Sequence, residues 1–259
     1  MSWAWIAALA TLGAAAALWQ RAGAARRFAR LRERFEDARD KLERLQHAFQ
    51  RFAPRDVVEN LAAGDEPRAD RREVTVLFAD LVGFTRLSEH TEPGALVRML
   101  NGYHARMQRV IAEHRGHVAL LIGDGILALF GAFDHNPWQS DDAARAALAM
   151  RLELEAYNEE LGGEQQAALS LGIGVHRGIV VAGLVGSSEL QQWTAVGRTV
   201  NLAARVQDLT RDLGVDVLLT ESVRGALDPR FRLRAMPART VRGIAEPVAT
   251  YALEGLAER

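Results

Sequence analysis

The sequence predicts an α+β sandwich in which helices pack on a mainly antiparallel sheet, preceded by a transmembrane helix and a coiled-coil helix. Three observations favour this fold class: an uncharged apolar stretch near the N-terminus, an apolar repeat of period 3.5 after it, and a long remainder that interleaves hairpin and amphipathic helix patterns. We expect a transmembrane anchor at 1–20, a coiled-coil helix at 21–53, a short helix and linker at 54–71, and a globular domain at 72–259.

The composition restricts the chemistry. The chain has 259 residues, a formal net charge of −1 and no cysteine. The charge predicts no bulk attraction to nucleic acid, and the lack of cysteine excludes disulfides, thiolate zinc sites and cysteine nucleophiles. Any metal must therefore have oxygen or imidazole ligands, which favours magnesium or manganese.

The apolar stretch covers residues 3–19 and reads WAWIAALATLGAAAALW. As a helix it would be roughly 26 Å long, close to the thickness of a thin hydrocarbon core, and tryptophan stands at both ends. The basic residues all follow it: Arg21, Arg26, Arg27 and Arg30. The positive-inside rule then predicts a single-pass protein of the inner or plasma membrane with a cytoplasmic globular domain. A cleaved signal peptide or a buried helix is the alternative.

The next segment carries a narrow apolar seam with alternating spacings of three and four residues. Its members are Phe28, Leu31, Phe35, Ala38, Leu42, Leu45, Phe49 and Phe52. A seam of this width and period is typical of a two-stranded coiled coil, which predicts a homodimer. An amphipathic helix lying on its own domain or on the membrane remains open. Pro54 ends the seam, and 64–67 reads as a linker.

The globular domain is expected to alternate strands and helices. The sequence predicts, in order, a strand at 73–79, a helix at 93–114, a hairpin of strands 117–122 and 126–130, a helix at 141–161 capped by Ser140 or Asp141, strands at 168–175 and 179–184 joined at 176–178, and a helix at 199–213.

Two carboxylates stand where these elements end. Asp80 closes the first strand and Asp124 lies at the tip of the hairpin. If the strands are neighbours, the two side chains converge at one edge of the sheet and could hold one or two magnesium ions. The following Gly83-Phe84-Thr85 segment would let backbone amides approach a phosphate. The alternative is that Asp80 is a helix N-cap and Asp124 an ordinary turn residue.

Four segments together resemble the successive signatures of class III adenylyl and guanylyl cyclases. They are FADLVGFT at 78–85, IGDGILALFG at 122–131, GVHRG at 174–178 and VGRTVNLAAR at 196–205. The resemblance covers roughly 72–256, with the four segments in the family's order. It implies a ferredoxin-like cyclase sandwich and a nucleotidyl cyclase activity.

The resemblance also implies roles for single residues. Asp80, Asp124 and the carbonyl of Leu81 match the ligands of two Mg²⁺ or Mn²⁺ ions per site. Asn201 and Arg205 match the catalytic pair that orients the ribose and stabilises the reacting phosphate. In this family the aspartates of one subunit face the catalytic pair of the other, so the resemblance implies a homodimer independently of the heptad seam.

The base site departs from the family pattern. Thr194 matches the base-reading position and favours ATP, but Leu120 stands where adenylyl cyclases carry an adenine-selecting lysine. Ile244 likewise replaces a phosphate-contacting lysine, which leaves Arg242 as the substitute candidate. Leucine cannot hydrogen-bond a base edge, so the base selectivity is open.

The sequence thus predicts an adenylate cyclase that converts ATP to 3′,5′-cyclic AMP and pyrophosphate by two-metal catalysis. The alternatives are a weak or inactive cyclase-like regulatory dimer and a cyclase with relaxed selectivity between ATP and GTP. For Trp193 and His176 we expect packing roles.

Overall fold

A computed structural model describes residues 32, 35, 36, 38–41, 69–133, 135–162, 168–187, 191–244 and 246–257. The chain divides into two units, 1–59 and 60–259. The apolar stretch 3–19 lies outside the described residues, and within the described part no helix is long and apolar enough to cross a membrane. The anchor therefore stays a prediction.

The described residues of the first unit are helical. Arg32 and Glu36, one turn apart, form an ion pair with a nitrogen–oxygen distance of 3.0 Å. Phe35, a member of the predicted seam, is 73% exposed. The helical conformation agrees with the sequence pattern, and pairing of two such helices stays a prediction.

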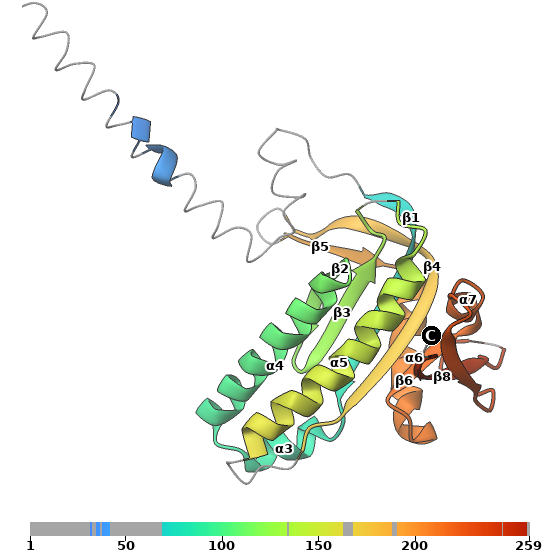
Figure 1. Cartoon of the computed structure of the whole chain (residues 1–259). Coiled ribbons are helices and arrows are strands. Elements are labelled where there is room, and N and C mark those ends of the chain that lie inside the picture. The colour runs from blue at the N-terminus through green and yellow to red at the C-terminus, as the bar shows by residue number, and fades with distance from the viewer. Residues whose placement is uncertain are drawn as a thin grey trace, which may run out of the picture. The chain divides into compact units, whose positions relative to one another are not determined.

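The second unit is built on one sheet of eight strands (Figure 1). The strands are β1 (Asp70–Leu81), β2 (Gly116–Ile122), β3 (Gly125–Phe130), β4 (Leu171–Gly186), β5 (Gln191–Val196), β6 (Val217–Thr220), β7 (Phe231–Ala235) and β8 (Thr250–Leu256). Their order is β2-β3-β1-β4-β6-β8-β7, and β5 pairs with β4. Of the strand pairs described, β4–β6 alone is parallel. The predicted mainly antiparallel sheet is confirmed.

Helices cover both faces of this sheet. They are α3 (Phe84–His90), α4 (Pro93–Glu113), α5 (Gln139–Leu161), α6 (Arg198–Leu213) and α7 (Glu221–Arg224). Figure 1 shows α4 and α5 side by side over one face. Successive residues of β6 point to opposite faces of the sheet. Val217 and Leu219 join the core under α4 and α5. Leu218, between them, packs with Val206 and Leu209 of α6 on the other face.

The local sequence explains where α4 begins. At the start of α4 the Glu92 carboxylate accepts hydrogen bonds from the amides of Gly94 and Ala95, and Pro93 occupies the first helical position.

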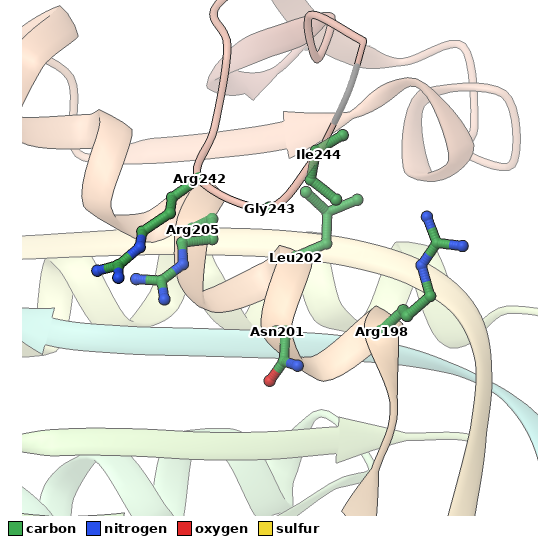
Figure 2. Close-up of a pocket in the computed structure, with 7 residues that line it drawn as sticks. All are labelled: Arg198, Asn201, Leu202, Arg205, Arg242, Gly243 and Ile244. Carbon is green, nitrogen blue, oxygen red and sulfur yellow. The ribbon is translucent and has the colours of Figure 1, made fainter.

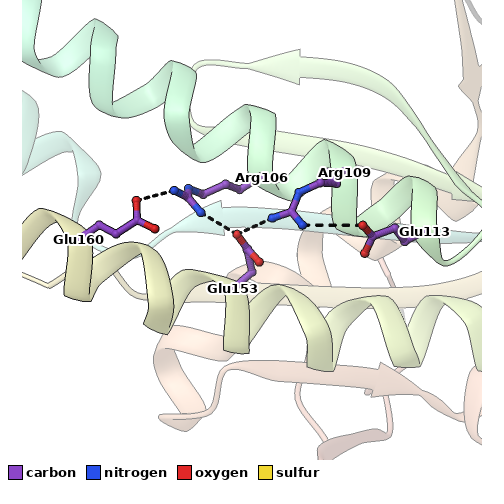
Figure 3. Close-up of polar contacts among 5 residues, drawn as sticks. All are labelled: Arg106, Arg109, Glu113, Glu153 and Glu160. Atoms are coloured by element: carbon purple, nitrogen blue, oxygen red, sulfur yellow. Dashed lines mark hydrogen bonds and ion pairs between the residues drawn. The ribbon is translucent and has the colours of Figure 1, made fainter.

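Charged side chains join α4 to α5 on their outer side, as Figure 3 shows. Glu153 of α5 accepts from Arg106 at 2.8 Å and from Arg109 at 2.7 Å. These contacts add orientation to a pairing that the apolar core already stabilises.

Two expectations about local structure are wrong. Neither Ser140 nor Asp141 caps α5, which begins after Trp138; the Asp141 carboxylate instead accepts from the amide of Asp228, 87 residues away. The expected break at 176–178 does not exist, since β4 runs unbroken from Leu171 to Gly186. β1 pairs with β4 through this segment, and the regular ladder holds it extended.

Candidate active site

The antiparallel pairing of β1 with β3 brings Asp80 and Asp124 together. Ala79 pairs with Ile126, so the end of β1 lies beside the start of β3, where Asp124 precedes the strand. The amide of Leu81 donates to Oδ2 of Asp124 at 3.1 Å. The expected convergence of the two carboxylates at one edge of the sheet is therefore what the structure shows.

The electrostatics of this pair suit a cation. Burial, and the hydrogen bond and negative charge of the neighbouring Asp124, raise the pKa of Asp80 to about 7, while Arg211 opposes the rise. Two carboxylates that interact in this way favour a shared proton or a bound positive charge. Their hard oxygens are the ligands that magnesium and manganese prefer, so these residues fit such an ion.

The protein supplies few ligands besides these two. Among the residues that the structure describes, no cluster of three or more histidine, aspartate or glutamate side chains could hold a metal ion. The carbonyl of Leu81 and oxygen atoms of a bound phosphate are the donors that would complete the coordination. A site of this kind binds metal most strongly together with a phosphorylated substrate.

The alternative role for Asp80 as a helix N-cap is excluded. Gly83 occupies the N-cap position of α3, with a φ of 77° that favours glycine, and no side chain caps that helix. α3 starts at Phe84, which packs against the core, and Thr85 is exposed in its first turn. The predicted phosphate-binding segment Gly83-Phe84-Thr85 thus follows the Asp80 end of β1 directly.

Arg211 is a site residue that the sequence analysis missed. Its Nη2 lies 3.1 Å from Oδ2 of Asp80, although 131 residues separate the two along the chain. Gly172 faces Asp80 across the β1–β4 ladder, and a Cβ on that glycine would contact Thr210 of α6. This close packing brings the last turn of α6 to Asp80. The one signal in the sequence is a basic residue in a helix's last turn, which is too common to indicate a site.

A second group of candidate residues lines a pocket of about 250 Å³ between α6 and the loop that follows β7 (Figure 2). The lining residues are Arg198, Asn201, Leu202, Arg205, Arg242, Gly243 and Ile244. Figure 2 shows the guanidinium groups of Arg205 and Arg242 on the same side of this pocket, and Asn201 pointing the same way from α6 as expected for residues four apart. Arg242 thus joins the predicted catalytic pair.

The pocket also contains Arg198, which the sequence analysis did not select. In Figure 2 its side chain extends away from Asn201. Arg205 itself has a carboxylate neighbour, since its Nη1 lies 3.2 Å from Oδ2 of Asp208. Both groups are largely exposed, so this ion pair is weak and leaves Arg205 available to a phosphate.

One chain does not bring the two groups of candidates together. Asp80 contacts the last turn of α6, whereas Asn201 lies in its first turns. The ten residues from Asn201 to Arg211 correspond to roughly 15 Å of helix. Within a single copy, the aspartate pair and Asn201 therefore lie beside different parts of α6.

The base-site candidates lie on β5 and β2, two strands of the described sheet that do not pair with each other. Thr194 of β5 pairs with Gly183 of β4, and Leu120 of β2 pairs with Leu127 of β3 directly after a register shift. The side-chain amide of Gln192 donates to the carbonyl of Ala119 at 3.1 Å, which joins β5 to β2. Both candidates are partly buried.

The expected packing roles of Trp193 and His176 agree with the structure. Trp193 is 6% exposed and stacks on Phe133 with ring centroids 4.2 Å apart. Nδ1 of His176 lies 2.9 Å from Oγ1 of Thr220, and burial lowers the pKa of this histidine to about 4. A neutral imidazole held in this way is part of the domain interior.

The mainly antiparallel sheet with covering helices agrees with the fold that the resemblance to the nucleotidyl cyclases implies. Residues 67–255 match the adenylate and guanylate cyclase catalytic domain family. The chain belongs to this family, as the four sequence motifs predicted.

Two of the named relatives are bacterial adenylate cyclases. The chain is 37% identical over 227 residues to an adenylate cyclase of Anabaena cylindrica, covering 82% of this chain and 44% of that protein. It is 31% identical over 186 residues to adenylate cyclase 1 of Rhizobium meliloti, covering 72% of this chain and 28% of that protein. The chain thus spans less than half the length of these relatives.

The solved structures confirm the fold. The guanylyl cyclase Cya2 is 32% identical, with a TM-score of 0.69 over 73% of this chain and 95% of that one. A bacterial light-regulated adenylyl cyclase reaches a TM-score of 0.74 at 24% identity, over 87% of this chain and 66% of that one. The second similarity supports the fold alone.

Proposed function

We propose that the protein is an adenylate cyclase that converts ATP to 3′,5′-cyclic AMP and pyrophosphate at sites shared between two copies of the chain. The main support for this proposal is that the aspartates and Asn201 lie beside different parts of α6, so that each group would form one half of a site. Asp80 contacts Arg211 in the last turn of this helix, whereas the pocket is lined by α6 residues between Arg198 and Arg205. A head-to-tail dimer would place the aspartates of one copy against the pocket of the next.

Exposed apolar side chains support an association of this kind. Val181 of β4 pairs with Val196 of β5, and these valines are 38% and 45% exposed. Ile179 and Val185 on the same strand are 54% and 44% exposed. An apolar strip on a sheet is costly to leave in water, and a second copy would cover it.

The proposed reaction is an attack of the ribose 3′-hydroxyl on the α-phosphorus of the same nucleotide, with departure of pyrophosphate. Asp80, Asp124 and the Leu81 carbonyl would hold two Mg²⁺ or Mn²⁺ ions, which supply charge neutralisation and a lowered hydroxyl pKa when bound. Asn201 would orient the ribose by hydrogen bonding. Arg205 and Arg242 would stabilise negative charge that grows on the phosphates in the transition state.

Two observations bear on the choice of base. Thr194 and the names of the Anabaena and Rhizobium relatives support ATP. Leu120 favours the second candidate, a cyclase with relaxed selectivity, because its side chain packs against a purine without reading the hydrogen-bonding edge. Product formation from ATP and from GTP, each with magnesium and with manganese, separates the two proposals.

For localisation we propose that residues 1–20 anchor the chain in the inner or plasma membrane, with the cyclase domain in the cytoplasm. The proposal is supported by the uncharged stretch and the arginines that follow it. Fractionation of cells that express the whole chain tests it, because a chain without 1–20 should leave the membrane fraction.

The shared site is tested by mixing two inactive variants of the full chain. Asp80→Ala removes a metal ligand and Asn201→Ala removes the ribose contact, so each variant alone should form almost no cyclic AMP. A mixed dimer contains one intact site, so mixing should restore activity, up to about a quarter of the wild-type value for random pairing with independent sites.

A double variant, Asp80→Ala with Asn201→Ala in one chain, is the matched control for the mixing experiment. Mixed with wild-type chains it can build no intact site within a mixed dimer. Absence of rescue from two variants that still dimerise would contradict the shared-site proposal.

A further inference from the structure

We propose that Arg211 is a positioning residue that fixes the Asp80 carboxylate as a metal ligand, in the way that the Leu81 amide fixes Asp124. The inference rests on the proposed metal-dependent function of these aspartates. It adds a residue from α6 to a site whose other members all lie between β1 and β3.

The four carboxylate oxygens divide into two kinds. Oδ2 of Asp80 accepts from Arg211 at 3.1 Å, and Oδ2 of Asp124 accepts from the amide of Leu81 at 3.1 Å. Oδ1 of Asp80 points to the hairpin instead, since a Cβ on Gly125 would lie 3.7 Å from it. Each carboxylate therefore has one oxygen that accepts a hydrogen bond from a donor of this protein, and the two carboxylates also interact with each other.

A hydrogen bond to one carboxylate oxygen affects metal binding because the carboxylate group can otherwise rotate about its single bonds. Donors behind the first ligands restrict that rotation, and removing one such donor typically weakens metal binding about 10–100-fold. Arginine suits this role because it keeps its charge at any relevant pH and holds a planar geometry. The Asp80 side chain is 27% exposed and that of Arg211 is 50% exposed, so solvent and a dissolved ion can reach the pair.

The opposite role for Arg211 makes the opposite prediction. If its guanidinium stood in for the metal ion, it would compete with Mn²⁺ for Asp80, and its removal would tighten metal binding. The use of Oδ2 by Arg211, with Oδ1 turned to the hairpin, favours positioning over competition.

The experiment measures Mn²⁺ binding to the full chain directly, by the electron paramagnetic resonance signal of the free ion. Arg211→Gln should weaken the binding about tenfold, and Arg211→Lys should recover part of it. Arg234→Gln is the matched control, because Arg234 forms a similarly exposed ion pair with Glu254 at 2.8 Å on β7 and β8. This control should bind Mn²⁺ as the wild type does.

A turnover assay supplies the second measurement. The Mn²⁺ concentration for half-maximal cyclase activity should rise in Arg211→Gln, while kcat at saturating Mn²⁺ should change far less. A residue that only stabilises the fold would lower kcat without this split.

Asp80→Ala separates failure of the inference from failure of the proposed function. Equal or tighter Mn²⁺ binding by Arg211→Gln, with Asp80→Ala weakened, would overturn the positioning role and leave the metal site standing. If Asp80→Ala binds Mn²⁺ as the wild type does, Asp80 is no metal ligand and both proposals fall.

Discussion

The carboxyl group of Asp80 is subject to opposing influences. Burial and the neighbouring Asp124 disfavour its negative charge, whereas Arg211 and the amide of Leu81 favour it. Burial and Asp124 have the larger effect, so the pKa of Asp80 rises from 3.8 to about 7. The ionised Asp80 carboxylate therefore destabilises the metal-free fold, and a bound cation would relieve this cost.

This balance predicts a pH-dependent stability of the metal-free protein. The folded state binds the Asp80 proton more tightly than the unfolded state does, so the free energy of unfolding should fall as the pH rises from about 4 to about 7. Asp80→Asn removes the charge and should stabilise the metal-free chain at pH 8 by about 1–2 kcal/mol, after allowance for solvent screening. Near pH 4 the difference should vanish.

Urea unfolding with a chelator present, at pH 4 and at pH 8, measures these differences. Glu254→Gln serves as the control. Glu254 is exposed, and its ion pair with Arg234 joins β8 and β7, which are separated from β1 by β4 and β6 in the sheet. A destabilised Asp80→Asn variant at pH 8 would show that the carboxylate stabilises the metal-free fold.

The helix α6 packs very closely on the sheet. Its backbone lies directly on Gly174 of β4, where a Cβ would be 2.2 Å from the amide nitrogen of Gln207 and 2.5 Å from the carbonyl oxygen of Ala203. Glycine at this position lets α6 lie low enough for Arg211 to reach Asp80. The third motif of the sequence analysis thus carries a packing function.

We therefore expect Gly174→Ala to lift α6 from the sheet. Because the clash is with backbone atoms that cannot rotate away, the free energy of unfolding should fall by about 3 kcal/mol. The metal and Asn201 half-sites should lose their alignment, so the activity of the folded fraction should fall as well. Denaturant unfolding and cyclase assays measure the two effects.

Gly162→Ala is the control for this substitution. It has the same chemical change at the C-cap of α5, where no atom lies within 4 Å of the added Cβ and φ is −61°. A loss of stability equal to that of Gly174→Ala would show that the close packing of α6 is not the cause.

At the scale of the whole molecule, the proposed shared site links activity to association. The specific activity of the full chain in detergent should fall on dilution as dimers dissociate, and the sedimentation profile should shift to monomer over the same concentration range. A specific activity that stays constant while the chain becomes monomeric would contradict the proposal of half-sites on separate copies.

Much of the fold followed from periodicity. The hairpin at 116–130, the helices α4, α5 and α6, and the mainly antiparallel sheet were predictable because apolar spacing and glycine turns act locally. The expected helix cap at Ser140 or Asp141 and the break at 176–178 were wrong because long-range partners decide both. The predicted anchor and coiled coil stay predictions.

The sequence by itself determined the family of this protein, because four motifs in order carry the aspartates, the asparagine and the arginine on which the proposed chemistry depends. Only the tertiary structure decided which of them meet. Strand pairing joined Asp80 to Asp124, helix packing brought Arg211 to Asp80, and the length of α6 kept Asn201 apart from both. Contacts between residues up to 131 positions apart depend on how whole elements pack, and no local pattern encodes them.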